Sequence, residues 1–215
     1  MAITAAGARL TETHRLAQAK IGAQAASDIL TLWTTIDPAR IEATFPPFAR
    51  TATAVINRRR ASSTQVASRY LEAFRLLEAP DLAAFTPVLA DTLAPARGVA
   101  NLAATGRSTT YRALRSGATL DEASSLGRSA ASRNALRLSL EGGRDTIVLT
   151  ATADTAVLGV MRVTSGDPCA FCAMLAARGP VYKTEASASF KPHDGCHCEP
   201  ELVYGTNTKL PDNSA

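Results

Sequence analysis

The four cysteines of this 215-residue chain lie within thirty positions of one another, and this crowding constrains the fold more than any other feature. Two of the three histidines lie in the same stretch. The clustered residues are Cys169, Cys172, His193, Cys196, His197 and Cys198. Residues this scarce would scatter along the chain if they were ordinary core or surface choices. A bound metal ion is the most economical common cause.

The spacing of these side chains favours a structural zinc site. Cys169 and Cys172 are three apart at the start of a predicted helix, which puts both sulfurs on one face, and the helix dipole favours thiolates there. Cys196 and Cys198 share a side if their segment is extended, and His197 then faces the other way. Structural zinc sites commonly join two such halves through a loop of about twenty residues. We predict Zn²⁺ with ligands drawn from Cys169, Cys172, His193, Cys196 and Cys198.

Other interpretations of the cluster are open. Disulfides are an alternative, but the cytoplasmic origin that we expect argues against them. A CxxC redox site or unliganded thiols are further alternatives, although a redox pair leaves the other two cysteines unexplained. The PCxxC half of a zinc deaminase signature is present, but no HxE precedes it. His193-Asp194 could form a hydrolytic pair, but ligand and loop roles are favoured, and a filled four-ligand zinc site is structural.

Charge is distributed unevenly along the chain. Residues 1–150 carry 18 basic against 12 acidic side chains, a net charge of +6, whereas residues 151–215 carry 5 against 7. Nearly all of the excess is arginine, which favours phosphate and carboxylate partners. A solvated helical surface is the favoured interpretation, and a nucleic-acid or partner contact at Arg58, Arg59 and Arg60 is the lesser one. Neither a membrane span nor a signal peptide is expected from the hydropathy pattern.

Hydrophobic periodicity predicts a helical region over residues 1–141. The expected helices cover 10–33, 38–45, 48–60, a segment capped by Ser62 and Gln65, a short helix after Pro80, and 95–116. Pro46-Pro47 is expected to break the second of these. His14 is expected on an exposed face. Thr119 and Glu122 form a capping box for a last helix that should end at Gly142-Gly143.

The residue composition changes after these glycines, and this change predicts a small α+β module over 142–204. Residues 146–150 and 157–163 are rich in β-branched side chains and are predicted to be strands. Asp167 should cap a helix with Pro168 at its first position, and Gly179 should end it. Residues 184–191 are expected to be irregular, and the tail, 205–215, to be disordered. The chain is therefore predicted to be mainly α, with a C-terminal module stapled by the CxxC…H…CxC zinc site.

The residues of this module resemble a known family. The segments 162–182, RVTSGDPCAFCAMLAARGPVY, and 193–201, HDGCHCEPE, are similar to the C-terminal motif of the phage Mu F-like minor head proteins of actinobacteriophages. The likeness is specific over about 144–204, and upstream it extends only to arginine- and alanine-rich helices that lead into Gly142-Gly143-Arg144-Asp145. The motif positions that carry over are Cys169, Cys172, His193, Cys196 and Cys198. Gly195 stands where relatives often have a second histidine.

This resemblance implies a minor head protein that is made in the host cytoplasm and resides in the head interior of the virion. The implied partners are the portal protein, scaffold and major capsid protein, with packaged DNA as a further one, and the implied role is in head assembly, packaging or genome delivery. Many relatives are labelled capsid maturation proteases, so a protease is the alternative, although no catalytic constellation emerges from the sequence. A DNA-binding factor that uses the arginine-bearing helices is a weaker alternative.

Overall fold

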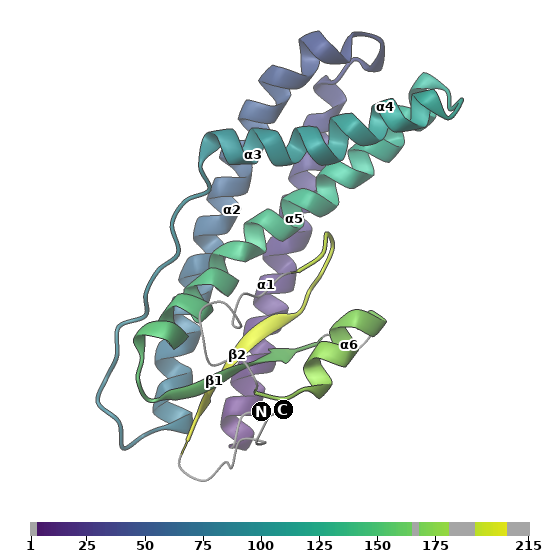
Figure 1. The fold of residues 1–215 in the computed structure, drawn as a ribbon. Helices are drawn as coiled ribbons and strands as arrows, with labels where there is room; N and C mark the ends of the chain where they lie inside the picture. The colour runs from purple at the N-terminus through teal and green to yellow at the C-terminus, as the bar shows by residue number, and fades with distance from the viewer. Residues whose placement is uncertain (1–3, 165–167, 181–191, 206–215) are drawn as a thin grey trace.

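Three long helices form the body of the protein in the computed structural model, which describes residues 4–164, 168–180 and 192–205. They are α1 (Ala5–Leu32), α2 (Ile41–Glu78) and α5 (Leu120–Ala153), and they pack side by side along most of their length (Figure 1). Short 3-10 turns at Trp33–Thr35 and Pro38–Arg40 connect α1 to α2. The expectation of a mainly helical chain is confirmed.

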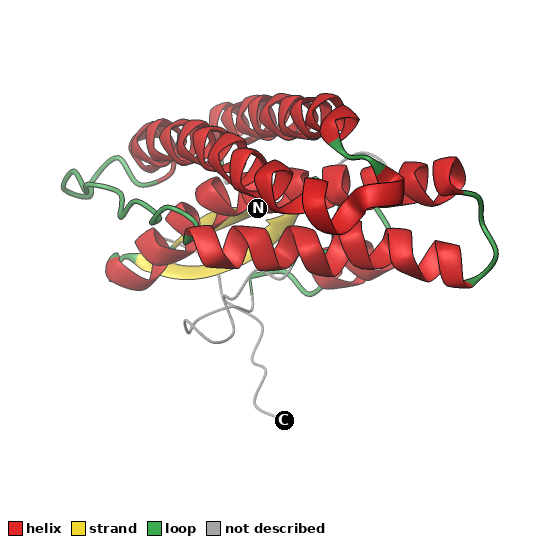
Figure 2. Cartoon of the chain, turned by 90° about the horizontal axis from the view of Figure 1, so that it is seen from above, coloured by secondary structure: helices red, strands yellow, loops and turns green. Residues whose placement is uncertain are grey.

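Shorter elements complete the two ends of this bundle. At one end, α3 (Pro95–Leu102), a π-helical turn (Ala103–Arg107) and α4 (Ser108–Arg115) run as one rod that packs on α5. At the other end, β1 (Val157–Val163) and β2 (Glu199–Tyr204) form an antiparallel two-stranded sheet, beside which lies α6 (Ala170–Ala177). Helices account for nearly all of the regular structure in Figure 2, and the two strands lie close against them.

The sheet is held to the bundle by an apolar cluster. Val160 of β1 and Leu202 of β2 are buried together with Phe74 of α2 and Ile147 of α5. Every residue of β2 is buried, including two glutamates. The C-terminal strand is therefore part of the main core, and the candidate site that adjoins it is carried on a rigid support.

Several predicted helix boundaries are wrong. α2 continues through Pro46-Pro47, which lie inside the helix: buried Phe45 and Phe48 flank them, and burial of these side chains offsets the backbone hydrogen bonds that the prolines remove. Ser62 does not begin a helix but lies inside α2. The helix expected after Pro80 is absent: residues 79–94 form an extended strap whose Val88 and Ala90 amides donate to the hydroxyls of Thr150 and Thr146.

The strand expected at 146–150 is also wrong, because α5 continues through Gly142-Gly143 as far as Ala153. A Cβ on Gly142 would lie 2.4 Å from the carbonyl oxygen of Arg60, and one on Gly143 would lie 2.5 Å from Gln18 Nε2. The glycines thus allow close approach of α5 to α1 and α2 rather than ending a helix. α5 crosses the proposed boundary between 1–141 and 142–204, and this division of the chain stays a prediction. The Thr119–Glu122 capping box is confirmed.

His14 is buried, which contradicts the exposed position expected from sequence. Its ring stacks on Tyr70, with centroids 4.3 Å apart, and neither ring nitrogen has a hydrogen-bond partner among the described residues. Burial lowers the pKa of His14 from 6.5 to about 3. The folded protein therefore holds this imidazole neutral over a range in which the unfolded chain protonates it.

This difference predicts a loss of stability in mild acid. Because the folded pKa of His14 is the lower one, its contribution is present above about pH 6.5 and is lost as pH falls toward about 3, at about 1.4 kcal/mol per pH unit. Between about pH 7.5 and about pH 5, wild type should lose about 2 kcal/mol relative to His14→Phe, as measured by urea unfolding. Comparing the two proteins cancels the contribution of Glu199, whose raised pKa acts in the opposite direction. Parallel pH profiles for the two proteins would contradict the assignment.

Candidate metal centre

The start of α6 brings the first two cysteines together. Cys169 is the N-cap of α6, and its sulfur accepts a hydrogen bond from the Cys172 amide at 3.4 Å. The helix thus begins at Ala170 rather than at Pro168, and the predicted cap, Asp167, lies outside the described residues. The expected end at Gly179 is confirmed by its φ of +68°. Both sulfurs lie at the helix N-terminus, where the dipole favours negative charge.

A tight turn supplies the second half of the site. The Cys196 amide donates to the carbonyl of His193 at 3.1 Å, and Gly195 between them has a φ of +84°. A left-handed conformation of this kind favours glycine over any residue with a Cβ. The turn brings the ring of His193 and the sulfur of Cys196 to the same side, facing α6. The presence of glycine at position 195 therefore has a structural reason.

The distances between the donor atoms suit a tetrahedral metal ion. Nε2 of His193 lies 3.1 Å from Cys169 Sγ and 3.8 Å from Cys172 Sγ, and the sulfurs of Cys172 and Cys196 are 3.7 Å apart. A tetrahedral zinc ion with ordinary bond lengths would place two sulfurs about 3.8 Å apart, and a sulfur and a nitrogen about 3.5 Å apart. The donors are already close to that arrangement.

The five predicted ligands form two overlapping groups. In each group the donor atoms lie within 4.8 Å of one another: one is Cys169, Cys172 and His193, and the other is Cys172, Cys196 and Cys198. Cys172 belongs to both groups and is the centre of the cluster. His197 belongs to neither. Cys172, Cys196 and Cys198 are buried, whereas Cys169 and His193 are exposed, so an ion could enter from the side of the latter pair.

The pKa values of the four thiols are spread widely by their mutual contacts. The amide of Cys172, followed by His193, lowers the pKa of Cys169 to about 7, and hydrogen bonding from Cys198 lowers the pKa of Cys196 to about 4. Burial raises the pKa of Cys172 to about 11, and contact with Cys196 raises that of Cys198. The lowered pKa values of Cys169 and Cys196 favour the thiolate form, which is the form that binds a divalent cation.

Arg144 on α5 binds, through its side chain, the backbone of the CxC segment, residues 196–198. Its side chain is 1 % exposed, and it donates to the carbonyl oxygens of Cys196, at 2.7 Å, and Cys198, at 3.1 Å. Its Nε also lies 3.6 Å from the carboxylate of Glu199, which is 2 % exposed. A guanidinium between two ligand carbonyls fixes the backbone from which both sulfurs project.

Further contacts position the surrounding residues. Nη1 of Arg162 on β1 lies 3.8 Å from Cys172 Sγ. The Asp194 carboxylate accepts from Arg137 Nε at 2.6 Å, whereas His193 Nδ1 faces the carbonyl oxygen of Asp194 at 3.2 Å. The carboxylate of Asp194 is therefore bound to α5 rather than to the imidazole. This arrangement favours the ligand role of His193 over the hydrolytic pair.

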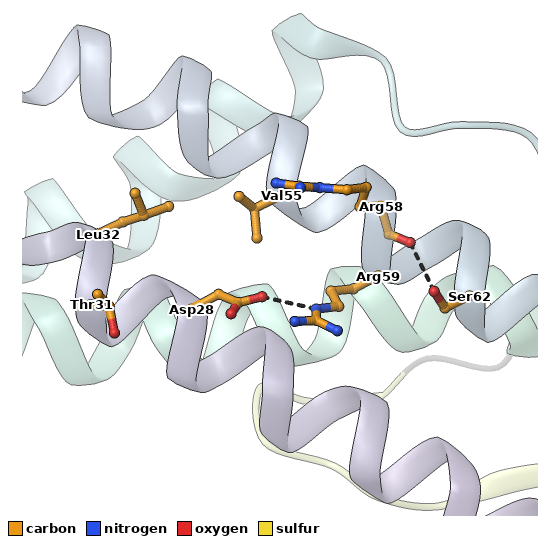
Figure 3. Close-up of a pocket in the computed structure, with 7 residues that line it drawn as sticks. All are labelled: Asp28, Thr31, Leu32, Val55, Arg58, Arg59 and Ser62. Carbon is orange, nitrogen blue, oxygen red and sulfur yellow. Dashed lines mark hydrogen bonds and ion pairs between the residues drawn. The ribbon is translucent and has the colours of Figure 1, made fainter.

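Arg58, Arg59 and Arg60 occupy three different environments. Arg60 is buried and donates to the carboxylate of Asp145 at 2.6 Å, so its charge is paired within the protein. Arg59 donates to the carboxylate of Asp28 at 2.8 Å, and Arg58 is exposed. Arg58 and Arg59 face the space between α1 and α2 (Figure 3). A partner contact at Arg58 and Arg59 stays a prediction.

Sequence reasoning missed the buried charges beside the cluster, Arg144, Arg162 and Glu199, and the buried Glu201 of β2. Of these four residues, Arg144 had the clearest signal of a buried position in the sequence, because it directly follows two glycines inside α5. Glu199 and Glu201 alternate with Pro200 and Leu202 in a way that predicts one exposed face, yet both faces are buried. Polar burial of this kind depends on partners distant in sequence.

Comparison with known proteins places the chain in one family of viral proteins. The chain belongs to the VG15 protein family, a family of viral proteins whose model matches residues 6–213. No curated protein and no solved structure gives a significant match. Among the described residues, none of the helices has the length and apolar character needed to cross a membrane.

The contacts of Arg144 predict a loss of metal affinity when its guanidinium is removed. We expect Arg144→Met to weaken Zn²⁺ binding by about 10–100-fold, because the Cys196 and Cys198 carbonyls lose their common donor. Arg144→Lys should recover only part of the affinity, since an ammonium cannot reproduce the planar fork. Competition with a chromophoric chelator gives the affinities.

Arg128→Met is the matched control, because Arg128 is exposed on the same helix. It should bind zinc as wild type does. An Arg144→Met protein that unfolds cooperatively and binds zinc with wild-type affinity would exclude the positioning role of Arg144.

Proposed function

We propose that this protein is a minor head protein of a tailed phage, with a C-terminal module held together by a structural zinc ion. The observation that carries the zinc assignment is the convergence of three or more thiol and imidazole donors around Cys172 at near-tetrahedral separations. Thiolate and imidazole ligands suit Zn²⁺, and a site filled by four protein donors has no open position for a substrate. The proposal for the head rests on membership of a viral family and on the C-terminal motif.

The proposed zinc ion would stabilise the module directly. Its ligands come from two segments, one at the start of α6 and one immediately before β2, and neither segment is long enough to bury a core of its own. Binding free energy then becomes folding free energy for these segments. The bundle, in contrast, has an extensive apolar core between α1, α2 and α5. The metal is therefore expected to order the C-terminal end of the molecule rather than the whole chain.

In the head, the protein would act beside the portal and contact scaffold and major capsid protein during assembly, with packaged DNA as a further neighbour. A bundle of long helices that carries exposed arginines, among them Arg50, Arg58 and Arg128, and a stapled module at one end suits a scaffolding or adaptor role. The protease alternative gains nothing from the contacts of His193 and Asp194. The DNA-binding alternative is weakened by the burial of Arg60.

Metal analysis tests the zinc proposal. Protein purified without chelators should contain one zinc per chain, and Cys172→Ser should lose it, because Cys172 belongs to both donor groups. Ala173→Ser, an exposed neighbour on α6, is the control and should retain the metal. Metal-free wild type with cysteines that pair on non-reducing gels would replace zinc by disulfides.

Composition of purified heads tests the functional proposal. We expect the protein at low copy in mature virions and in complexes that co-purify with tagged portal protein. Heads that lack the protein, together with failure to co-purify with portal, would exclude the minor head role. Trimming of the major capsid protein that stops with Asp194→Ala, in a variant that keeps its zinc, would instead support the protease.

A further inference from the structure

A groove between α1 and α2 is lined by charged, polar and aliphatic side chains. It encloses about 470 Å³, within the range of known ligand sites. Figure 3 shows its walls, with α1 on one side and α2 on the other. The lining residues are Asp28, Thr31, Leu32, Val55, Arg58, Arg59 and Ser62.

The groove contains two arginines, and only Arg59 is paired with a carboxylate of the groove. Arg59 donates to the Asp28 carboxylate at 2.8 Å and to Gln24 Oε1 at 2.9 Å, which fixes its guanidinium across the groove. The guanidinium of Arg58 is exposed and makes no hydrogen bond or ion pair with another residue in the described part of the chain. It lies along α2 beside Val55 (Figure 3). An incoming carboxylate would find one open, bidentate donor here.

The hydroxyl groups of the groove are oriented as acceptors. Ser62 Oγ donates its hydrogen to the carbonyl of Arg58 at 3.2 Å, and Thr31 Oγ1 donates to the carbonyl of Ser27 at 3.1 Å. Their lone pairs therefore remain for N–H donors of a ligand. Leu32 and Val55, both half-buried, add apolar wall between them. The groove thus offers a cation, two acceptors and an aliphatic surface.

We propose that this groove binds a segment of a partner protein that presents a carboxylate next to an aliphatic side chain. A peptide supplies all three complements: an acidic side chain for Arg58, backbone N–H groups for the hydroxyls, and an aliphatic group for Leu32 and Val55. A nucleic acid supplies fewer, because its phosphates would meet a single unpaired arginine with Asp28 close by, whereas phosphate tracking needs several free cations. The net charge of +6 over residues 1–150 would also attract an acidic partner.

This site is independent of the proposed place of the protein in the phage head. Absence from virions would leave the groove as it is, and failure of the groove to bind an acidic peptide would leave the head role and the zinc site untouched. The partner could belong to the head or to the host, and the recognition chemistry is the same in either case.

Nuclear magnetic resonance titration of the full chain tests the proposal with defined probes. The capped peptide acetyl-LEAL-amide should shift the methyl resonances of Leu32 and Val55 and the Nε–H resonance of Arg58. Acetyl-LQAL-amide, which lacks only the charge, should bind about tenfold more weakly, as expected for loss of a charge-assisted pair. A twelve-nucleotide oligothymidylate should bind more weakly than the acidic peptide.

Arg58→Gln should reduce affinity for acetyl-LEAL-amide about tenfold and leave that for acetyl-LQAL-amide unchanged. Arg50→Gln is the matched control, since Arg50 is exposed on α2 outside the groove. Equal binding of the two peptides, an unchanged affinity in Arg58→Gln, or tighter and strongly salt-dependent binding of the oligonucleotide would each overturn the proposal.

Discussion

One buried guanidinium, that of Arg144, joins the helical bundle to the metal-binding segments. Placing it in the interior has a large desolvation cost, which is offset by the two cysteine carbonyls and by the nearby Glu199 carboxylate. Because the cost is offset only when the CxC segment lies in one position, this contact selects a single arrangement of Cys196 and Cys198. The positions of Cys196 and Cys198 are in this sense set by α5, and the proposed metal would add the link to Cys169 and Cys172 at the start of α6.

The same helix organises the rest of the molecule. Gly142 and Gly143 allow α5 to approach α2 closely, and the Gly143 amide donates to Ser63 Oγ at 2.9 Å, which in turn donates to Gln18 on α1 at 2.7 Å. A hydrogen-bonded chain of this kind needs all three helices in register. Polar contacts thus specify how the helices cross, whereas the apolar core supplies most of the driving force.

Local signals in the sequence predicted local features well. The scarcity and spacing of the cysteines led to five side chains that the fold brings together, and the Thr119 cap and the end at Gly179 follow from residue chemistry within one turn. The failures share one cause, which is packing between distant segments. β-branched residues at 146–150 remain helical because Ile147 is buried against the bundle, and His14 is covered by Tyr70. The contacts of Arg144 could not be predicted because its acceptors lie more than fifty positions away.

Segments 190 positions apart meet in the core, where Thr11 Oγ1 of α1 donates to the Glu201 carboxylate of β2 at 2.6 Å. During synthesis, the Thr11 hydroxyl therefore has no access to this partner until Glu201 has been translated. Contacts between residues so far apart in sequence raise the contact order, which slows folding. A chain that ends before Glu201 would leave this part of the core open, and proteases can recognise such chains.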